Sequence, residues 1–256
     1  MNQPVSSSTP TSQAEWQALA TNLTLEGRAY LNGAYQWAAN GETFTSVSPI
    51  DGRELASIAS CDQSDADQAV RAARAAFEAG IWSQLAPAKR KAVLLRFADL
   101  IEAHGDELAL LETLDMGKPI NHARNVDVPA TARAIRWTAE AIDKVYGELA
   151  PTPHNQIGMI SREPMGVVAA IVPWNFPMIM AAWKIAPALA TGNSVILKPS
   201  EKSPLSAIRL AALAGEAGVP AGAFNVLPGY GHTVGKALAR LEWCVRCLAV
   251  GAPALS

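Results

Sequence analysis

Two kinds of hydrophobic spacing divide this chain. Between residues 64 and 145, apolar positions recur every three or four residues, as in Val93, Phe97, Leu100 and Ile101, and this period is typical of amphipathic helices. From residue 166 onward, short runs rich in valine and isoleucine alternate with alanine-rich stretches of helical length. Strands that alternate with helices in this way predict an α/β fold with a parallel sheet and flanking helices.

The helical part predicts several separate helices. Ser64, with Asp67 three residues later, is interpreted as an N-cap and capping box that opens a helix over residues 65–79. A further helix is expected over residues 107–114. The helix expected over residues 130–145 has the hydrophobic spacing to bury one stripe of side chains: Ala134, Trp137, Ala141 and Val145.

The first part of the chain has weaker patterns. Residues 1–26 are rich in Ser, Thr, Gln and Pro, and we expect a mobile leader, because such a segment buries too little surface to offset its ordering entropy. The alternative is one short amphipathic turn formed by Trp16, Leu19 and Leu23. Asn32-Gly33 predicts a tight hairpin turn. A second β pair is expected around the turn at residues 48–52. Residues 27–145 would then supply the first strands and helices of the domain.

The second half begins with a proline-rich stretch. Residues 146–164 contain three prolines and alternate weakly around Ile157 and Met159, which predicts an extended hairpin or arm. Residues 165–240 then follow a regular rhythm with right-handed crossovers expected between parallel strands. The predicted order is strand 167–172, helix 178–190, strand 194–197, helix 204–217, strand 223–227 and a glycine-rich turn at 229–235 that opens a last helix.

Composition narrows the function classes. The 256-residue chain is 50% hydrophobic with a formal charge of −2, which gives no electrostatic reason to expect nucleic acid or a membrane surface as a partner. The N-terminal residues lack the basic and apolar regions of a secretory signal, and the apolar runs are shorter than the ~20 residues of a membrane span. We therefore expect a soluble cytoplasmic protein. Cys244 and Cys247 have no second pair or histidine cluster beside them, so no metal site is expected.

Polar residues stand where two of the predicted strands end. Asn175 lies in the turn Pro173-Trp174-Asn175-Phe176-Pro177, while Lys198 and Glu201 follow the next strand. Ligands of open α/β sheets bind at the carboxyl ends of the parallel strands. We therefore expect the three side chains to converge on one small-molecule crevice.

Each of these residues also has a purely structural interpretation. Two prolines would hold the Asn175 amide rigidly, as an oxyanion donor requires, but an asparagine can equally complete a turn. Lys198 and Glu201 could bind ribose or phosphate groups, or form an exposed ion pair worth ~0–1 kcal/mol. Gly229-x-Gly231 is placed to face a phosphate with backbone N–H groups, although a lone glycine turn is weak evidence. The local patterns do not decide these questions.

Several ordered motifs together resemble the N-terminal half of the aldehyde dehydrogenase superfamily. The likeness extends from about Arg28 to Arg240, and the stretches that carry it are Leu111–Pro119, Pro173–Pro177, Gly192-Asn193, Lys198–Glu201 and Pro228–Gly231. Residues 134–148 and 202–206 look most like the branch that oxidises aminoaldehydes from polyamine breakdown. The resemblance implies a Rossmann-like cofactor domain, and it identifies the arm at residues 146–164 with the hairpin through which subunits of the family pair into homo-oligomers.

The resemblance also implies residue roles. Asn175 matches the amide that holds the aldehyde oxygen while a cysteine thiolate attacks, giving a thioester that water hydrolyses to the acid after hydride transfer to NAD. Lys198 and Glu201 match residues that bind the adenine ribose. A carboxylate at position 201 favours NAD, with NADP also possible, and Asp115 matches a position near a monovalent-cation site of some members. Further positions match cofactor contacts: Ile171, Pro173, Trp174, Ser200 and Gly231.

The likeness stops after residue 240. The tail at residues 241–256 matches neither the family's Gly-Ser-Thr turn nor its nucleophile context, and the catalytic domain is expected to be absent. A shifted reading frame or a truncated gene would explain the change. Covalent catalysis requires the nucleophile, so we expect this chain alone not to oxidise aldehydes. The alternative from another class is a non-catalytic nucleotide-binding or subunit-pairing protein.

Overall fold

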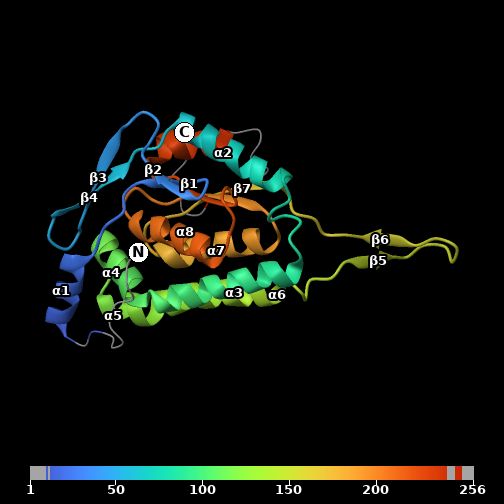
Figure 1. Cartoon of the computed structure of the whole chain (residues 1–256), viewed down its shortest axis with the longest axis horizontal. Coiled ribbons are helices and arrows are strands. Elements are labelled where there is room, and N and C mark those ends of the chain that lie inside the picture. The colour runs from blue at the N-terminus through green and yellow to red at the C-terminus, as the bar shows by residue number, and fades with distance from the viewer. Residues whose placement is uncertain (1–9, 11, 241–245, 250–256) are drawn as a thin grey trace.

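A mixed sheet forms the centre of the molecule. A computed structural model describes residue 10, residues 12–240 and residues 246–249 of the chain. This part contains a six-stranded sheet of order β10-β7-β8-β9-β1-β2 (Figure 1). The parallel strands are β7 (Val167–Ile171), β8 (Ser194–Lys198), β9 (Phe224–Val226) and β10 (Arg246–Ala249), and the antiparallel pair at the other edge is β1 (Ala29–Leu31) and β2 (Ala34–Gln36). The predicted α/β class is confirmed.

The strand order reverses beside β7. The chain steps from β7 through β8 to β9 and then returns to place β10 on the other side of β7, with Arg246 opposite Val168. Such a reversal is where open α/β sheets bind their ligands, and the turn after β7 is the proline-flanked segment of Asn175. The sequence analysis assigned no strand within the tail at residues 241–256, so β10 is a difference. The rest of the tail, including Cys244, lies outside the described residues.

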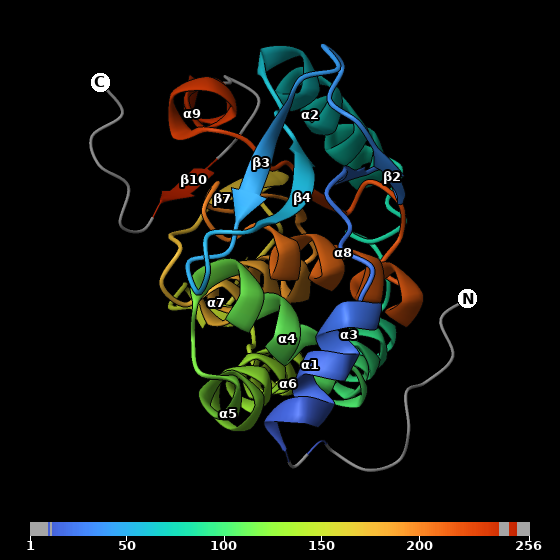
Figure 2. The ribbon, with the colours of Figure 1, turned by 90° about the vertical axis from the view of Figure 1, so that its left-hand side faces the viewer.

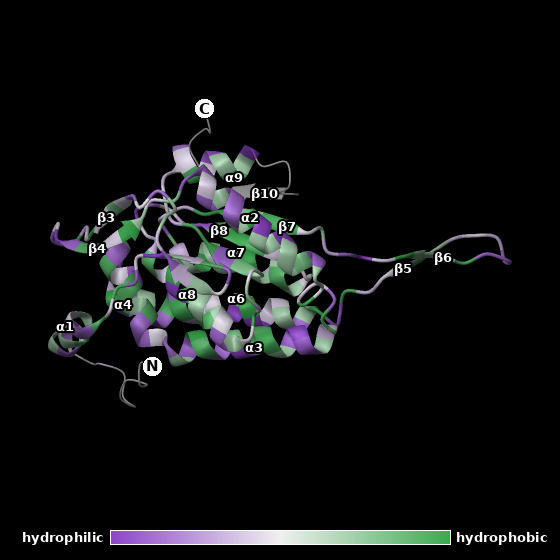
Figure 3. Cartoon of the chain, turned by 45° about the horizontal axis from the view of Figure 1, so that its top comes forward, coloured by the Kyte–Doolittle hydropathy of each residue, from purple (hydrophilic) through white to green (hydrophobic). Residues whose placement is uncertain are grey.

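Two layers of helices cover the sheet (Figure 2). One layer contains α7 (Pro177–Ala190) and α8 (Leu205–Ala217), backed by α3 (Pro87–Ala103) and α6 (Val128–Ala141); the other contains α2 (Gln63–Glu78) and α9 (Lys236–Arg240). Side chains of β7 alternate between the layers: Val168 and Ala170 join the first core, Val167 and Ala169 the second. Because both faces are buried, the strand is apolar throughout. Figure 3 shows this hydrophobic colour along β7, β8 and α7.

Smaller elements surround this body. The hairpin of β3 (Thr43–Val47) and β4 (Glu54–Ala59) and the helices α4 (Gly105–Met116) and α5 (Ile120–His122) lie together at one end. Single π-helical turns, η1 (Ala123–Asp127) and η2 (Gly231–Gly235), precede α6 and α9. At the opposite end, β5 (Glu148–Ala150) and β6 (Gly158–Ile160) form an antiparallel arm that projects from the body (Figure 1). The predicted hairpin is confirmed, as is the Asn32-Gly33 turn, whose residues both have positive φ.

Two helix predictions near the N-terminus need correction. The expected mobile leader is wrong for its second part, because α1 (Gln13–Asn22) forms there with a capping box between Ser12 and Glu15 and buries Trp16. A reciprocal cap satisfies two orphan N–H groups, which the general composition of the segment does not reveal. Helix α2 also begins earlier than predicted, because Asp62 is its N-cap and Asp65 closes the capping box.

The buried face of α6 differs from the predicted one. Trp137 is 72% exposed and Val145, beyond the helix, is 63% exposed. The buried stripe instead contains smaller or β-branched side chains: Val128, Thr131, Ala132, Ile135 and Ala139. Both stripes have helical spacing, so periodicity alone cannot separate them. The stripe of smaller side chains is the buried one because α6 packs closely against both α3 and α7. Such close contacts between helices leave no room for an indole ring.

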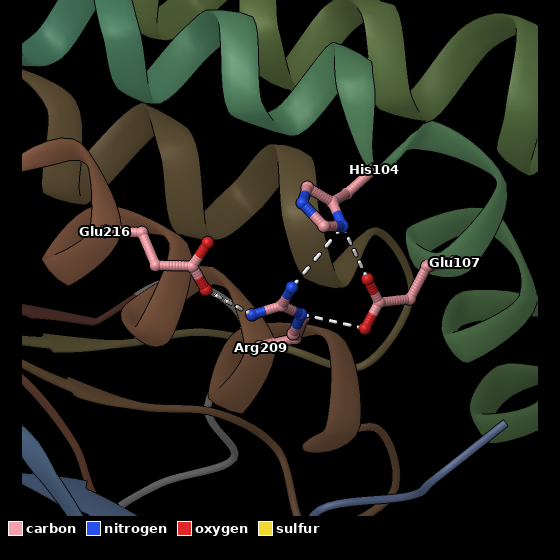
Figure 4. Close-up of polar contacts among 4 residues, drawn as sticks. All are labelled: His104, Glu107, Arg209 and Glu216. Atoms are coloured by element: carbon pink, nitrogen blue, oxygen red, sulfur yellow. Dashed lines mark hydrogen bonds and ion pairs between the residues drawn. The ribbon is translucent and has the colours of Figure 1, made fainter. Parts of the chain in front are cut away.

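A polar network joins α8 to the corner between α3 and α4 (Figure 4). Glu107 accepts hydrogen bonds from Arg209 at 2.8 Å and lies 2.8 Å from Nδ1 of His104. Arg209 also reaches Glu216 at 3.0 Å. Burial opposes ionisation of Glu107, but the bonds from His104 and Arg209 hold its pKa below the ordinary value. The network therefore fixes the helix that follows the Lys198–Glu201 turn.

Two buried side chains connect distant segments of the body. The Trp82 indole donates to the carbonyl of Leu189 at 3.0 Å, near the C-terminal end of α7. Asp115 accepts from the Ser46 hydroxyl at 2.7 Å and from the Leu205 N–H at 2.8 Å. These contacts tie α7 to the loop before α3, and tie α4 to β3 and to the start of α8.

The Trp82 contact generates a stability prediction. Trp82→Phe should lower the unfolding free energy by about 1–3 kcal/mol, because it removes a buried hydrogen bond and leaves a cavity. Trp137→Phe is the matched control and should change it by less than about 0.5 kcal/mol, since that ring is exposed. Urea unfolding of both variants measures the difference. Equal effects at the two positions would contradict the assigned burial.

The Asp115 contact generates a pH prediction. Burial raises the pKa of Asp115 to about 7, against the lowering effect of bonds from Leu205 and Ser46. The folded chain therefore keeps a proton that the unfolded chain releases above its ordinary pKa, and the contribution of Asp115 to stability falls as pH rises through this window. The stability advantage of the wild type over Asp115→Asn should thus shrink between pH 5 and pH 8 in chemical unfolding. An unchanged difference, equal to that of the exposed Asp51→Asn control, would refute the assignment.

Candidate functional site

The backbone brings two turns together at the carboxyl ends of β7 and β8. Ile171 pairs with Lys198, and the next N–H, that of Val172, donates to the Lys198 carbonyl at 3.1 Å. The Ser203 hydroxyl donates to the Trp174 carbonyl at 3.3 Å, which links the turn after β8 to the turn after β7. The two turns therefore lie side by side at this edge of the sheet.

Lys198 and Glu201 form a half-buried ion pair. The ammonium donates to Glu201 Oε2 at 3.4 Å, with side-chain exposures of 3% and 33% respectively. Burial lowers the pKa of Lys198, and the Glu201 carboxylate opposes this shift. Because the lysine is buried, the structure does not support the alternative of a fully exposed pair. A lysine has three donors, so this long bond leaves hydrogen-bonding capacity at the site.

The turn of Asn175 has a rigid backbone and an accessible amide. Pro173 precedes the turn, and Pro177 occupies the first position of α7. The Asn175 side chain is exposed, and within the described part of the chain no hydrogen bond holds it. Trp174 and Phe176, on either side, are 50% and 43% exposed. The amide is thus free to donate to a bound molecule rather than being used to complete the turn.

A cavity of about 450 Å³ opens beside these turns. Of the predicted site residues, Trp174 and Glu201 line it, whereas Asn175, Lys198 and Gly231 do not. Its wall includes residues from four separate segments: Phe44, Thr45, Ser46, Val47, Pro49, Asp115, Met116, Lys202 and Tyr230. The sequence analysis placed no binding residue in the β3 segment, because no local motif shows that this hairpin folds against the sheet edge.

The glycine-rich turn forms the third side of the site. Gly229 has φ 145°, and a Cβ there would lie 2.9 Å from the Cys61 carbonyl, so the turn requires glycine. Gly231 faces open space, because no atom of the described residues lies within 4 Å of a Cβ placed there. Between them, Tyr230 packs against Phe44 with ring centroids 5.2 Å apart. A ligand could therefore approach the Gly231 backbone closely.

Metal and cysteine chemistry find little support in the described residues. Within residues 12–240, no three His, Cys, Asp or Glu side chains are grouped as a metal site would require. Cys61 is fully buried, and burial strongly raises the pKa of its thiol, so it is a structural residue rather than a nucleophile. No described helix has the length and apolar content of a membrane span.

Comparison with known proteins adds direct relatives. The chain is 61% identical over 227 residues to the NADP/NAD-dependent aldehyde dehydrogenase PuuC of Escherichia coli K12, a match that covers 89% of this chain and 46% of PuuC. An indole-3-acetaldehyde dehydrogenase solved with NAD+ superposes with a TM-score of 0.91 at 63% identity, over 92% of this chain and 48% of that one. A gamma-glutamyl-gamma-aminobutyraldehyde dehydrogenase of Burkholderia cenocepacia J2315 gives a TM-score of 0.90 at 59% identity, over 91% and 47%.

The chain spans about half the length of the relatives that it matches. The profile of the aldehyde dehydrogenase family covers residues 37–249, and this range includes both strand-end turns, the glycine turn and β10. The expectation that the likeness stops after residue 240 was therefore wrong by nine residues, because β10 belongs to the matched range. The family's shared sequence and the superposed fold thus agree over the same part of the chain. This protein belongs to the aldehyde dehydrogenase family.

Proposed function

We propose that this chain supplies the cofactor-binding half of an NAD-dependent aldehyde dehydrogenase. The single observation that carries the proposal is the buried ammonium of Lys198, which meets Glu201 at the carboxyl end of β8 beside the reversal of strand order. An acidic residue at such a strand end binds ribose hydroxyls in nicotinamide-binding folds. The pair offers both donors and an acceptor to a ribose, so the chemistry of these side chains fits the adenosine half of NAD.

The neighbouring residues fit the rest of a dinucleotide. Ile171 and Trp174 supply apolar surface beside the strand ends, and Pro173 stiffens the backbone between them. Ser200 is buried next to the Lys198–Glu201 pair. The open space at Gly231 would admit the adenine end close to the backbone. In this arrangement the protein holds and orients the cofactor, and NAD supplies hydride acceptance when bound.

Glu201 favours NAD over NADP in this proposal. Its carboxylate would repel a 2′-phosphate, whereas it accepts hydrogen bonds from a free 2′-hydroxyl. Lys202 lines the same cavity and offers a positive charge nearby, so NADP is a second cofactor. The relative from Escherichia coli is described as using both.

Asn175 has the catalytic role in the proposed reaction. Its accessible amide would donate to the aldehyde oxygen as negative charge develops there, an interaction of the oxyanion-hole type. The nucleophile would be a cysteine thiolate, which would add to the aldehyde carbon and form a thiohemiacetal. Loss of a hydride from that carbon to NAD+ would leave a thioester, and water would hydrolyse the thioester to the acid and release the thiol. Cys61 cannot fill that role because it is buried and its thiol pKa is raised. The names of two relatives, an aminoacetaldehyde dehydrogenase of Pseudomonas aeruginosa and the gamma-glutamyl-gamma-aminobutyraldehyde dehydrogenase, support an omega-aminoaldehyde as the substrate class.

A second candidate function is non-catalytic subunit pairing through the arm. Four apolar side chains of residues 146–160 are at least three-quarters exposed: Tyr146, Leu149, Ile157 and Met159. Burial of such side chains against another subunit is favourable. The exposed arm supports a homo-oligomer under either candidate function, so the oligomeric state does not distinguish the two. Binding of NAD distinguishes the cofactor-binding function from subunit pairing alone.

Calorimetric titration of the purified chain with NAD tests the proposal. Lys198→Met and Glu201→Gln should each weaken NAD binding about 10- to 100-fold, because each removes a charge-assisted hydrogen bond. Glu201→Gln should also narrow the preference for NAD over NADP. Lys91→Met is the matched control, since Lys91 pairs with Asp143 away from the site. No NAD binding by the wild type, or equal affinity in all variants, would overturn the proposal.

A further inference from the structure

A lysine outside the proposed cofactor site has an unusual set of neighbours. The Lys118 ammonium contacts the Asp127 carboxylate, lies 3.5 Å from Glu112 Oε1 and lies 4.0 Å from the centre of the Phe176 ring. Its side chain is only 11% exposed. None of the roles proposed above uses this cluster, although Phe176 directly follows Asn175 in the sequence.

The local backbone helps to bring the three ionisable groups together. Gly117 adopts the left-handed conformation that ends α4, and Lys118 follows it directly. The π-helical turn η1 places Asp127, which is 1% exposed, opposite the lysine. Single π-turns inside helices often occur at functional positions. The geometry therefore depends on two local departures from regular helix.

The charges in the cluster are balanced. Glu112 is completely buried, and neither of its carboxyl oxygens has a hydrogen-bond partner within the described residues. Burial, together with the nearby Asp127, raises the pKa of Glu112 and so favours its neutral form. The remaining charges, Lys118 and Asp127, then neutralise each other. The Lys118 ammonium is thus held in place with one side directed at the Phe176 ring.

Phe176 contacts the Lys118 ammonium and belongs to the turn at residues 173–177 that contains Asn175. It is the residue before α7, and its carbonyl accepts the first helical hydrogen bond, from Met180 at 2.9 Å. Ammonium groups are attracted to the face of an aromatic ring, so Lys118 restrains where this half-exposed ring lies. The neighbouring Asn175 side chain has no hydrogen bond of its own in the described structure. Its direction is therefore set by the turn alone.

We propose that Lys118 is a positioning residue for Asn175. Held by Asp127 and Glu112, its ammonium fixes the Phe176 ring and, through the stiff turn between Pro173 and Pro177, the direction of the Asn175 amide. The catalytic consequence rests on the proposed function, but the orientation itself does not. A purely structural cluster would stabilise α4 and η1 without affecting the amide.

The test measures the Asn175 side-chain amide directly by 1H–15N NMR of the labelled full chain, with the signal assigned through Asn175→Asp. In the wild type the amide should be ordered. In Lys118→Met its order parameter should fall below about 0.6, the range of flexible groups. Lys118→Arg should restore the wild-type signal, because arginine keeps the ion pair and the contact with the ring.

Two controls separate this inference from its alternatives. Lys91→Met should leave the Asn175 amide unchanged. NAD affinity of Lys118→Met should stay within about twofold of the wild type, because Lys198 and Glu201 are intact and distant effects are small. Absence of NAD binding in the wild type would refute the proposed function while leaving the amide measurement valid.

An unchanged Asn175 amide in Lys118→Met, with only a lower thermal midpoint, would overturn the inference. Should that variant fail to fold, Phe176→Leu replaces it, because this half-exposed ring can be changed without opening the core. The amide should then lose order as well. An ordered amide in Phe176→Leu would refute the role of the ring.

Discussion

The hydrogen bond from the Val172 N–H to the Lys198 carbonyl is the contact on which the site depends. It lies at the carboxyl ends of β7 and β8, and both polar turns begin directly after it. Because the strands are parallel, their turns leave the sheet on the same edge, and the Ser203 bond to the Trp174 carbonyl keeps them together. A slip of one residue would turn Lys198 to the other face. The apolar cores on both faces prevent such a slip.

The burial of Lys198 at the end of β8 bears directly on the proposed binding of NAD. A buried ammonium is unfavourable unless it is paired, and a single long bond to Glu201 is a modest partner in the described structure. Two neighbouring arrangements also leave room for a ligand: an Asn175 amide for which the described residues provide no hydrogen bond, and a space at Gly231 that the described atoms leave open. Hydrogen-bonding capacity and space thus gather at one end of the sheet. A nucleotide ribose and the oxygen of a second bound molecule would use them.

The sequence predicted the local parts of this arrangement better than the distant ones. The strands, the arm and the strand-end turns could be predicted because alternation, proline and glycine act within a few residues. The buried stripe of α6 could not, since its competing stripe with Trp137 has the same period and only packing against α3 and α7 decides. The cavity wall from Phe44 to Pro49 needs a contact between segments far apart in sequence. Lys118 was visible in a motif, but its partner Asp127 depends on a π-turn.

A crystal structure of this chain grown with NAD+ tests the central claim most directly. The account predicts the adenosine ribose at the carboxyl end of β8, with its hydroxyls within hydrogen-bonding distance of Lys198 Nζ and the Glu201 carboxylate, and the adenine near Gly231. NAD+ bound anywhere else on the chain, with the Lys198–Glu201 pair unchanged and empty of ligand, would contradict it.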